Sequence, residues 1–378
     1  MTDRVHGRQR QPEIGPRVLF FSGGTALNDT AAALKHHTHN SVHLVTPFDS
    51  GGSSQVLRQA FDMPAVGDLR SRLVALAGSS GSATLLLSHR LPKEADQASL
   101  RREFHQLSDG SHPLMLNVDS GPLDQILKML AVFSEAVPTD FDFRQASVGN
   151  LIIAGGYIAY DHALQPVLAW MSKTMGVLGT VSPIADVNLQ VGVELQDGSR
   201  VIGQARFTGK ESAPITRPIH RIFMADESSE VLPDRVSLTD GNARLIDTAD
   251  LICFPPGSLF SSVIANLLPK GVGKKVAERR VPKIYVPSLG RDPECIGMTL
   301  PDQVGALLAA LRMDAGQDCP TQKLVSRVVS CREVLSPDVV DRIARLHGIE
   351  CLALDIAQKD RPDRYEPERL CQALLSLC

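Results

Sequence analysis

Three segments rich in glycine and serine carry the residue types that bind phosphate groups. The first contains Gly23, Gly24, Thr25 and Asn28, the second contains Asp49, Ser50, Gly51, Gly52, Ser53 and Ser54, and the third contains Gly257, Ser258 and Ser261. Glycine lets the backbone approach a ligand closely, and the amides at the start of a helix attract an anion. Hydroxyl groups add hydrogen bonds to a phosphate or a sugar. The three segments therefore predict a site for a phosphorylated, nucleotide-like ligand.

Each segment also has a purely structural explanation. The first fits a tight turn in which Thr25 caps a helix, and the second fits an Asx-turn followed by a serine cap. The first segment lacks both the full Gly-x-Gly-x-x-Gly motif and the Gly-Lys-Ser/Thr of a P-loop. A single segment leaves both explanations open. Three of them at corresponding strand ends favour a ligand site, because ligands of open α/β sheets bind outside the carboxyl ends of the strands.

Two carboxylates are the candidates for catalysis and for metal binding. Asp49 and Asp68 offer the oxygen ligands that suit Mg²⁺, and both are predicted to serve as metal ligands and as catalytic groups. Arg70 is predicted to make a forked contact with a phosphate, and Asn150 is predicted to lend an amide to the site. The alternatives are that Asp68 and Asn150 cap helices and that Arg72 lies on a charged helix face.

Histidine and cysteine residues give no comparable pattern. His36, His37 and His39 form a cluster, but they lie at the predicted end of a polar helix, where cationic side chains suit the helix dipole, so a metal role is not favoured. The seven cysteines form no Cys-x-x-Cys pair and have no zinc-finger spacing. An odd number of scattered thiols fits a reducing cytoplasm, and no nucleophile with a neighbouring base stands out.

Alternating strands and helices position these residues. Short apolar runs bounded by glycine and proline are predicted to be buried strands, and the stretches between them are predicted to be helices. The predicted strands span residues 17–21, 41–46, 250–254, 283–286, 323–330 and 350–354. Such alternation is typical of parallel strands with right-handed crossovers. The predicted fold class is a three-layer α/β/α, Rossmann-like protein with a mostly parallel sheet.

The same pattern predicts one domain from residue 17 to residue 378. Residues 1–16 are polar and are predicted to form a flexible tail. Residues from about 78 to 180 are predicted to be a helical segment. A β-hairpin insertion is predicted at about 185–225, with arms at 188–194 and 200–207, a turn at Asp197-Gly198, and a further strand at 219–224. A helix is predicted to run from Ser258 to about Leu268.

Composition excludes several classes of protein. The formal net charge is −3, and the 378 residues include one Trp, four Tyr and twelve Phe. Such a chain lacks the basic surface and the stacking rings that are typical of nucleic-acid-binding proteins. No apolar run reaches about 18 residues, so no membrane span is predicted, and the N-terminus has no signal-peptide pattern. We therefore expect a cytoplasmic protein with a small-molecule ligand.

The order and spacing of the motifs resemble the CofD/YvcK family. The motifs are Phe21-Ser22-Gly23-Gly24-Thr25, Phe48-Asp49-Ser50-Gly51-Gly52-Ser53-Ser54, Gly67-Asp68-Leu69-Arg70, Val148-Gly149-Asn150-Leu151, Glu194-Leu195-Gln196-Asp197-Gly198, Pro256-Gly257-Ser258-Leu259-Phe260-Ser261-Ser262 and Asn266-Leu267-Leu268. Each motif is weak alone, but their order is specific. The resemblance covers roughly residues 17–310 and implies a CofD-like α/β domain.

The two branches of this family imply different functions. CofD proteins are 2-phospho-lactate transferases that use a guanylylated donor, a deazaflavin alcohol as acceptor and Mg²⁺. YvcK-like proteins, called gluconeogenesis factors, bind nucleotide sugars, and the Gly-Gly-Ser-Ser loop of this chain is closer to theirs. Ser50 and the segment Pro293-Glu294-Cys295 depart from the family pattern. Such departures are expected of a divergent CofD-related subgroup, such as the subgroup named for the GAK system.

Two functional hypotheses follow from the residues and the resemblance. The first is a Mg²⁺-dependent transferase that binds a nucleoside-diphosphate-linked donor and moves a phospho-linked group by positioning and charge stabilisation. The second is a non-catalytic regulatory protein that binds a nucleotide sugar with the same loops. A deazaflavin acceptor would require an aromatic-lined pocket, which the low aromatic content disfavours. The family also implies a homodimer, and the helices from residue 151 to residue 177 are either its contact surface or plain core.

Overall fold

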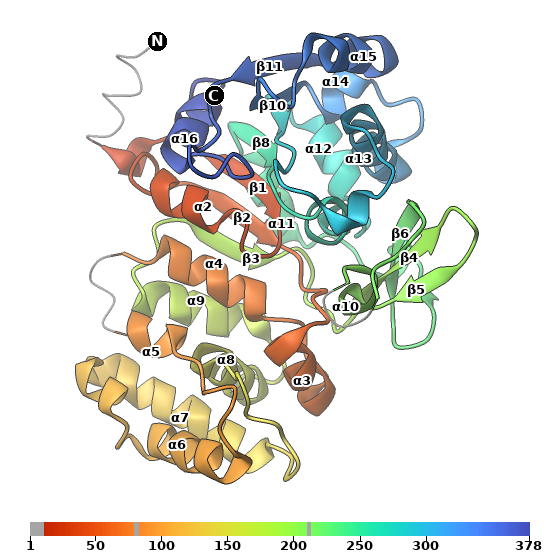
Figure 1. Cartoon of the computed structure of the whole chain (residues 1–378). Helices are drawn as coiled ribbons and strands as arrows, with labels where there is room; N and C mark the ends of the chain where they lie inside the picture. Colours follow the sequence, from red (N-terminus) through yellow and green to blue (C-terminus); the bar gives the residue numbers. More distant parts are fainter. Residues whose placement is uncertain (1–10, 79–82, 210–212) are drawn as a thin grey trace.

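The computed structural model describes residues 11–78, 83–209 and 213–378. This part of the chain forms a seven-stranded parallel sheet flanked by helices, a further block of helices, and a separate four-stranded antiparallel sheet (Figure 1). The predicted α/β class, with a mostly parallel sheet and an inserted β region, is confirmed.

The strand order of the parallel sheet is β11-β10-β9-β8-β1-β2-β3. The strands are β1 (Val18–Ser22), β2 (Val42–Val45), β3 (Thr180–Pro183), β8 (Leu251–Phe254), β9 (Lys283–Tyr285), β10 (Arg327–Cys331) and β11 (Glu350–Leu354). The chain winds outward from β1 to β3, returns to the other side of β1 with β8, and then winds outward to β11. The winding therefore reverses between β1 and β8, which is the position where open α/β sheets bind ligands.

The central strands are buried on both faces, and their side chains alternate between two cores. The helices of these two faces are α2 (Asn28–Leu34), α11 (Asp240–Asp247), α12 (Val272–Glu278), α13 (Leu300–Ala315), α14 (Thr321–Leu324), α15 (Pro337–His347) and α16 (Pro367–Leu375). Val18 and Phe20 of β1 share a core with α2 and α16, whereas Leu19 and Phe21 share one with α12 and α13. Burial on both faces explains the unbroken apolar runs in the sequence.

A block of helices extends from the β2–β3 side of the sheet and occupies the lower part of Figure 1. It consists of α3 (Gly52–Phe61), α4 (Gly67–Leu76), α5 (Thr84–Ser88), α6 (Gln97–Asp109), α7 (Ser120–Ala136), α8 (Val148–Ala159) and α9 (Leu164–Thr174). Ten consecutive residues of α8, Val148 to Tyr157, are buried. The helix is therefore core rather than an open contact surface, and a homodimer through this region stays a prediction.

The antiparallel sheet has the order β5-β4-β6-β7. Its strands are β4 (Gln190–Leu195), β5 (Arg200–Ile202), β6 (Ile219–Ala225) and β7 (Glu230–Val231). The predicted turn at Asp197-Gly198 and the strand at 219–224 are confirmed. The second hairpin arm, predicted at 200–207, is wrong beyond Ile202, because Gly203 has a φ of +99° and turns the chain into α10 (Gln204–Phe207).

Two other boundaries differ from the sequence prediction. β3 was not predicted. It begins at Thr180, where the predicted helical stretch ends, and its sequence Thr-Val-Ser-Pro contains only one large apolar side chain. The strand is stabilised by its pairing with β2 (Val42↔Thr180), which the local sequence pattern does not reveal. The strand predicted at 323–330 begins only at Arg327, since Thr321–Leu324 form α14.

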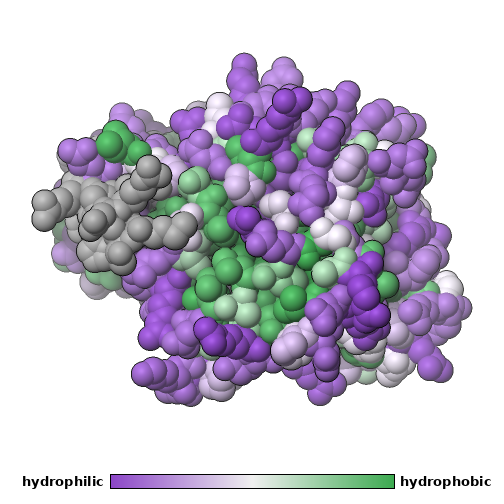
Figure 2. Space-filling view, turned by 90° about the horizontal axis from the view of Figure 1, so that it is seen from above, coloured by the Kyte–Doolittle hydropathy of each residue, from purple (hydrophilic) through white to green (hydrophobic). Residues whose placement is uncertain are grey.

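Residues 1–10 of the predicted tail lie outside the described residues. From Pro12 onward the chain is hydrogen-bonded to the segment before β2, because Asn40 Nδ2 donates to the carbonyl oxygens of Glu13 (2.8 Å) and Gly15 (2.9 Å). Across the described ranges, no helix is both long and apolar enough to span a bilayer. Figure 2 looks onto the upper end of the molecule and shows apolar side chains in the middle of this face, surrounded by polar ones.

α7 and α8 approach each other closely at Gly155. A Cβ atom on Gly155 would lie 1.9 Å from the carbonyl oxygen of Met129 and 3.1 Å from Cβ of Phe133. Both neighbours belong to α7, and the first is backbone, which cannot rotate away. The glycine therefore fixes the distance between the two helices.

We predict that Gly155→Ala lowers the free energy of unfolding by about 1–3 kcal/mol, because the extra methyl group forces the helices apart. Equilibrium unfolding in urea measures the change. The control is Gly121→Ala at the start of α7, where no described atom outside the helix's own first turns lies within 4 Å of the added Cβ. The control should remain within about 0.5 kcal/mol of wild type. Equal stabilities of Gly155→Ala and wild type would contradict the close approach.

Candidate functional site

The turns that follow β1, β2 and β8 lie at one edge of the sheet. β1 is the neighbour of both other strands and runs parallel to them, with Leu19 opposite Val42 of β2 and Val18 opposite Leu251 of β8. Parallel neighbours place their carboxyl ends at the same edge. The structure thus brings together the three segments that the sequence analysis selected.

The turn after β1 packs directly against the other two turns. A Cβ atom on Gly23 would lie 2.4 Å from Cγ2 of Thr46, which follows β2, and 3.2 Å from Cα of Ser262, which follows β8. Gly24 has a φ of +61°, a left-handed conformation that favours glycine. The close approach of the neighbouring segments therefore requires glycine at position 23, and the backbone conformation favours glycine at position 24. Thr25 is not the helix cap of the structural explanation, because α2 begins only at Asn28.

A buried asparagine joins the turns after β1 and β8. Asn266 Nδ2 donates to the carbonyl oxygen of Ser22 (3.0 Å) and to that of Ser262 (2.8 Å). Asn266 lies in one of the motifs that resemble the family, but its role was not apparent from the sequence. The segment around it is also less regular than the predicted helix, because a π-helical turn (Leu259–Val263) is followed by a 3₁₀ turn (Ile264–Leu267).

The loop after β2 has the Asx-turn of the structural explanation. Asp49 Oδ1 accepts the Gly51 N–H at 3.1 Å, and α3 begins directly after it at Gly52. Ser50 Oγ accepts the Ala205 N–H at 3.0 Å, so its hydroxyl connects this loop to α10 beside the antiparallel sheet. The predicted serine cap is not formed, because the residue before α3 is Gly51 and its side chain cannot accept a hydrogen bond.

The starts of α3, α4 and α8 converge around Gly67. A Cβ atom on Gly67 would lie 2.6 Å from Ser54 Oγ and 4.0 Å from both Asp49 Oδ2 and Asn150 Nδ2. Asn150 contributes through its side chain, because Nδ2 donates to Ser53 Oγ at 3.2 Å. Four predicted site residues thus lie side by side, and they offer carboxylate, hydroxyl and amide groups.

Asp68 links this cluster to the turn after β1. It lies in the first turn of α4, and its Oδ2 accepts the Gly24 N–H at 2.5 Å. A backbone amide that was predicted to bind a ligand phosphate therefore contacts a carboxylate of the protein itself. Asn28, also predicted to bind ligand, donates from Nδ2 to Ser71 Oγ at 2.8 Å, which ties α2 to α4.

α4 carries two buried guanidinium groups next to the site. Arg70 is 7% exposed and donates from Nε to Asn150 Oδ1 at 2.9 Å, whereas Arg72 is 1% exposed. Arg72 Nε and one terminal nitrogen have no hydrogen-bond partner within the described part of the chain. The alternative that Arg72 lies on a charged helix face is therefore wrong, because the side chain is in the interior.

Burial lowers the pKa of both arginines to about 10. Arg90 lowers the pKa of Arg70 further, and Asp68 raises the pKa of both groups because its negative charge favours the guanidinium. Both arginines still carry a full charge at neutral pH. Two positive charges in a medium of low polarizability strongly favour negative groups nearby, so the surroundings of Asp68 suit an anion.

Two carboxylates that the sequence analysis did not select occupy the start of the segment after β8. Glu294 Oε2 accepts the N–H groups of Phe260 and Ser261, each at 2.9 Å, and Asp292 Oδ2 accepts the Leu259 N–H at 2.8 Å. Ser261 Oγ also donates to Glu294 Oε1. The sequence marked Glu294 only as a departure from the family pattern. Glu294 is 33 and 34 residues away from its partners in the sequence, so no local pattern predicts these contacts.

Glu294 is completely buried, and burial raises the pKa of its carboxyl to about 7. The negative charge of Asp292 adds to this shift, whereas the hydrogen bonds from Ser261 and Phe260 act against it. Glu294 therefore changes its charge near neutral pH, at the edge of the sheet where the winding reverses.

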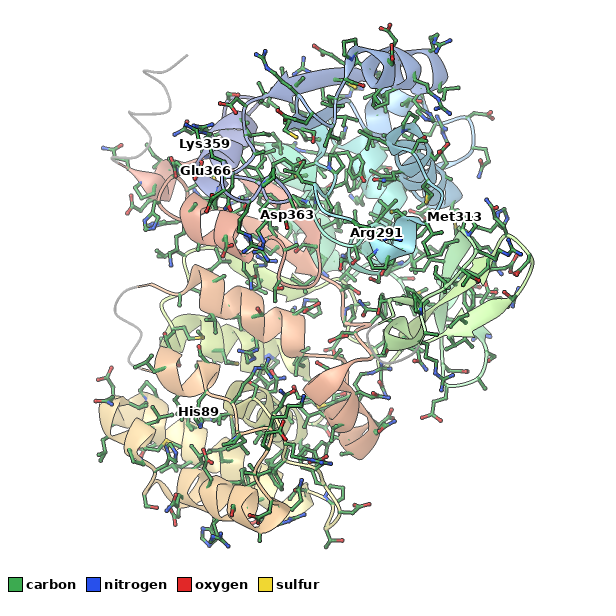
Figure 3. All side chains as sticks on the ribbon, viewed as in Figure 1. His89, Arg291, Met313, Lys359, Asp363 and Glu366 are labelled. Carbon is green, nitrogen blue, oxygen red and sulfur yellow. The ribbon has the colours of Figure 1, made fainter. Side chains whose placement is uncertain are left out.

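A cavity of about 340 Å³ opens between the turns after β1 and β8. Its lining includes Thr25, Asp29, Gly257, Ser258, Arg291 and Asp363. Figure 3 labels Arg291 and Asp363 in this region, the first from the loop after β9 and the second from the loop before α16. The amide of Gly257 itself donates to Ser288 Oγ at 3.0 Å, so it stabilises the cavity wall.

A second cavity of about 520 Å³ lies between α3 and the antiparallel sheet. Its lining includes Ser50, Arg58, Asp62, Asn188, Arg206 and Asp226. Arg58 donates to the carbonyl oxygen of Asp49 (3.3 Å) and to Asn188 Oδ1 (2.9 Å), and burial lowers its pKa. Of the described residues around this cavity, none is aromatic.

Two of the histidines at 36–39 lie next to acidic side chains. His37 Nε2 pairs with Glu368 Oε1 at 2.7 Å, whereas His39 Nδ1 lies 3.8 Å from Glu13 Oε1, so the two rings have different partners.

Comparison with known proteins assigns the family. The model of the family described as 2-phospho-L-lactate transferase CofD matches residues 18–365. The chain belongs to the CofD family. The gluconeogenesis factor of Bacillus subtilis is 27% identical over 89% of this CofD-family chain and 83% of its own length. A putative gluconeogenesis factor of Deinococcus radiodurans is 28% identical over 96% of this chain and 66% of its own length.

A solved structure supports the fold of this CofD-family protein. It belongs to a UPF0052-family protein from Bacillus halodurans and superposes with a TM-score of 0.67. The match covers 95% of this chain and 99% of the other, at 22% sequence identity. The arrangement of sheets and helices is therefore shared, and the resemblance expected from the sequence motifs is confirmed at the level of family and fold.

We predict that stability depends on pH through Glu294. The folded-state pKa of about 7 exceeds the ordinary value of 4.5, so the stabilisation that Glu294 provides is complete below about pH 4.5 and is lost as the pH rises through 7. Relative to Glu294→Gln, wild type should lose on the order of 3 kcal/mol of unfolding free energy between pH 5 and pH 8. Urea unfolding of both proteins at each pH measures the difference.

Glu230→Gln is the matched control for this comparison. The hydrogen bond from Arg221 lowers the pKa of Glu230, so that carboxyl is ionised in both the folded and the unfolded state above about pH 5.5. The difference between wild type and Glu230→Gln should therefore be constant from pH 5.5 to pH 8. A constant difference for Glu294→Gln over the same range would show that Glu294 does not titrate there.

Proposed function

We propose that this CofD-family protein binds a nucleoside-diphosphate-linked donor at the turns after β1, β2 and β8, and transfers a phospho-linked group with Mg²⁺. The observation that carries the proposal is the placement of Asp49 and Asp68 at one sheet edge, next to the buried guanidinium groups of Arg70 and Arg72. Carboxylates beside buried cations form an environment that accepts further negative groups together with a metal ion.

The residues present fit Mg²⁺. Asp49 Oδ2, Ser54 Oγ and the Asn150 amide surround the position of Gly67, and Asp68 follows directly in the chain. Mg²⁺ prefers oxygen ligands and is commonly held by one or two carboxylates together with substrate phosphates and water. Asp49 and Asp68 would hold the ion. Bound there, the ion would supply positive charge to the phosphate oxygens of the donor.

In this proposal, each of the two cavities binds a different part of the ligand. The cavity at the winding reversal is lined by Thr25 of the turn after β1, by Gly257 and Ser258 of the turn after β8, and by Arg291. These groups suit the phosphorylated part of the donor. The cavity's volume of about 340 Å³ is within the range of small-molecule sites. The described lining of the cavity beside α3 is mostly polar and charged and contains no aromatic residue, so this cavity suits a hydroxyl-rich group rather than a flavin-like ring.

A second candidate function is a regulatory protein that binds a nucleotide sugar without turnover. Two observations favour it. The described lining of the cavity beside α3 is polar and lacks aromatic side chains, which suits a sugar. The relatives named gluconeogenesis factor align with most of the chain. Neither observation requires a chemical step.

A thermal-shift panel of nucleoside diphosphates and nucleotide sugars, with and without Mg²⁺, tests the proposal. We predict an upward shift of a few degrees that requires Mg²⁺, because the carboxylates repel the ligand phosphates without a cation. Asp49→Asn and Asp68→Asn should each weaken Mg²⁺-dependent binding about tenfold or more. Asp124→Asn on the exposed surface of α7 is the control and should bind like wild type.

The same panel distinguishes the two functions when product formation is followed by mass spectrometry. A donor that is consumed in the presence of Mg²⁺ supports transfer. A nucleotide sugar that binds without Mg²⁺ and is recovered intact supports the regulatory function and contradicts transfer. The absence of any shift with every nucleotide would contradict both.

A further inference from the structure

A group of three metal-ligating side chains lies outside the site described above, in the lower block of helices. His89 follows α5, Glu103 is in α6, and His112 precedes a 3₁₀ turn (Pro113–Asn117). Figure 3 labels His89 well away from Arg291 and Asp363, which line the cavity at the winding reversal. This group is independent of the proposed function.

The ligand atoms are close enough to share one ion. His89 Nε2 lies 2.9 Å from Glu103 Oε1, and His112 Nε2 lies 3.8 Å from the same oxygen. The donor atoms of the three residues lie within 4.8 Å of one another, and this is the one such group of histidine, cysteine and acidic residues in the described ranges. Around a tetrahedral ion with bonds of 2.0–2.1 Å, ligand atoms are separated by about 3.3 Å. Small side-chain rotations therefore suffice.

We propose that His89, Glu103 and His112 bind one zinc-class divalent cation. Two imidazoles and one carboxylate are ligands that Zn²⁺, Co²⁺ and Ni²⁺ prefer, whereas Mg²⁺ prefers oxygen alone. The three side chains are partly buried, with exposed fractions of 30%, 25% and 13% for His89, Glu103 and His112. Solvent can therefore provide the fourth ligand. Two neutral imidazoles and one carboxylate leave a net charge of +1 on the bound ion.

Binding changes one hydrogen bond in the surroundings. His112 Nδ1 accepts the Leu114 N–H at 3.2 Å, which places the ring proton of the neutral histidine on Nε2. Coordination through Nε2 requires the proton to be on Nδ1 instead, so this long hydrogen bond is exchanged for the bond to the metal. Leu114 is only partly buried, so water can replace this hydrogen bond.

The cation would connect three elements that are separate in the sequence. It would fix the end of α5, the middle of α6 and the start of the 3₁₀ turn to one another. The backbone oxygen of His89 accepts the N–H of Val148, the first residue of α8, and that helix carries Asn150 into the candidate site. The metal would therefore stabilise the helical block at the point where it supports α8.

Titration of the full chain with Zn²⁺ after treatment with a chelator tests the proposal. A chromophoric chelator as competitor gives the affinity and the number of ions bound. We expect one tight ion per chain and a higher melting temperature in its presence. His89→Ala and Glu103→Gln should each weaken that ion's binding about tenfold or more. His105→Ala, an exposed histidine on the same helix α6, is the control and should bind like wild type.

Substitution with Co²⁺ identifies the ligands independently. Visible d–d bands without a thiolate charge-transfer band in the near ultraviolet would support imidazole and carboxylate ligands. A strong thiolate band, lost when the seven cysteines are alkylated, would assign the ion to cysteine and overturn the proposal. Unchanged Zn²⁺ affinity in both Glu103→Gln and His89→Ala would also overturn it. Circular dichroism confirms that each variant is folded, and Glu103→Gln retains a side chain that can accept the hydrogen bond from His89.

Discussion

The burial of two positive charges on α4 determines much of the architecture around the candidate site. Arg70 and Arg72 project from the first two turns of a helix that begins at the sheet edge, and both are almost inaccessible to water. A buried guanidinium without compensation costs several kcal/mol. Asn150 compensates one of them through a hydrogen bond, and Asp68 lowers the cost of both through its charge. The incomplete hydrogen bonding of Arg72 leaves positive potential next to Asp68, and this potential favours an anion at the site.

The three turns form one packed unit around these charges rather than three independent loops. Gly23 is in contact distance of the segments after β2 and β8, and Asn266 bonds to the carbonyl oxygens of Ser22 and Ser262. Asp68 in turn accepts from Gly24. Movement of any one turn therefore disturbs the others. Such a unit holds its polar groups at fixed positions before a ligand arrives, which reduces the entropy that binding has to overcome.

The sequence was informative where structure depends on local pattern. Buried parallel strands appear as unbroken apolar runs, so β1, β2 and β8 and the turns after them could be located, and the family resemblance followed from those turns. β3 could not be found, because it is stabilised by pairing with β2 rather than by its own composition. The role of Glu294 and the burial of Arg72 were also inaccessible, since each depends on contacts between segments far apart in the chain. An arginine on a helix is more often exposed, and only packing decides otherwise.

The protein's own carboxylates occupy positions at which helix starts would otherwise attract phosphate. Asp68 accepts the amide of Gly24, and Glu294 accepts the amides of Phe260 and Ser261, at the two turns that border the winding reversal. A phosphate that enters between them meets negative charge on both sides when Glu294 is ionised. Two like unit charges about 4 Å apart repel each other by about 1–4 kcal/mol in a partly solvated site. A divalent cation between carboxylate and phosphate converts this repulsion into attraction, and protonation of Glu294 removes one part of it. If the proposed nucleotide binds at this edge, the arrangement of these carboxylates makes its binding depend on a metal ion and weakens it as Glu294 loses its proton.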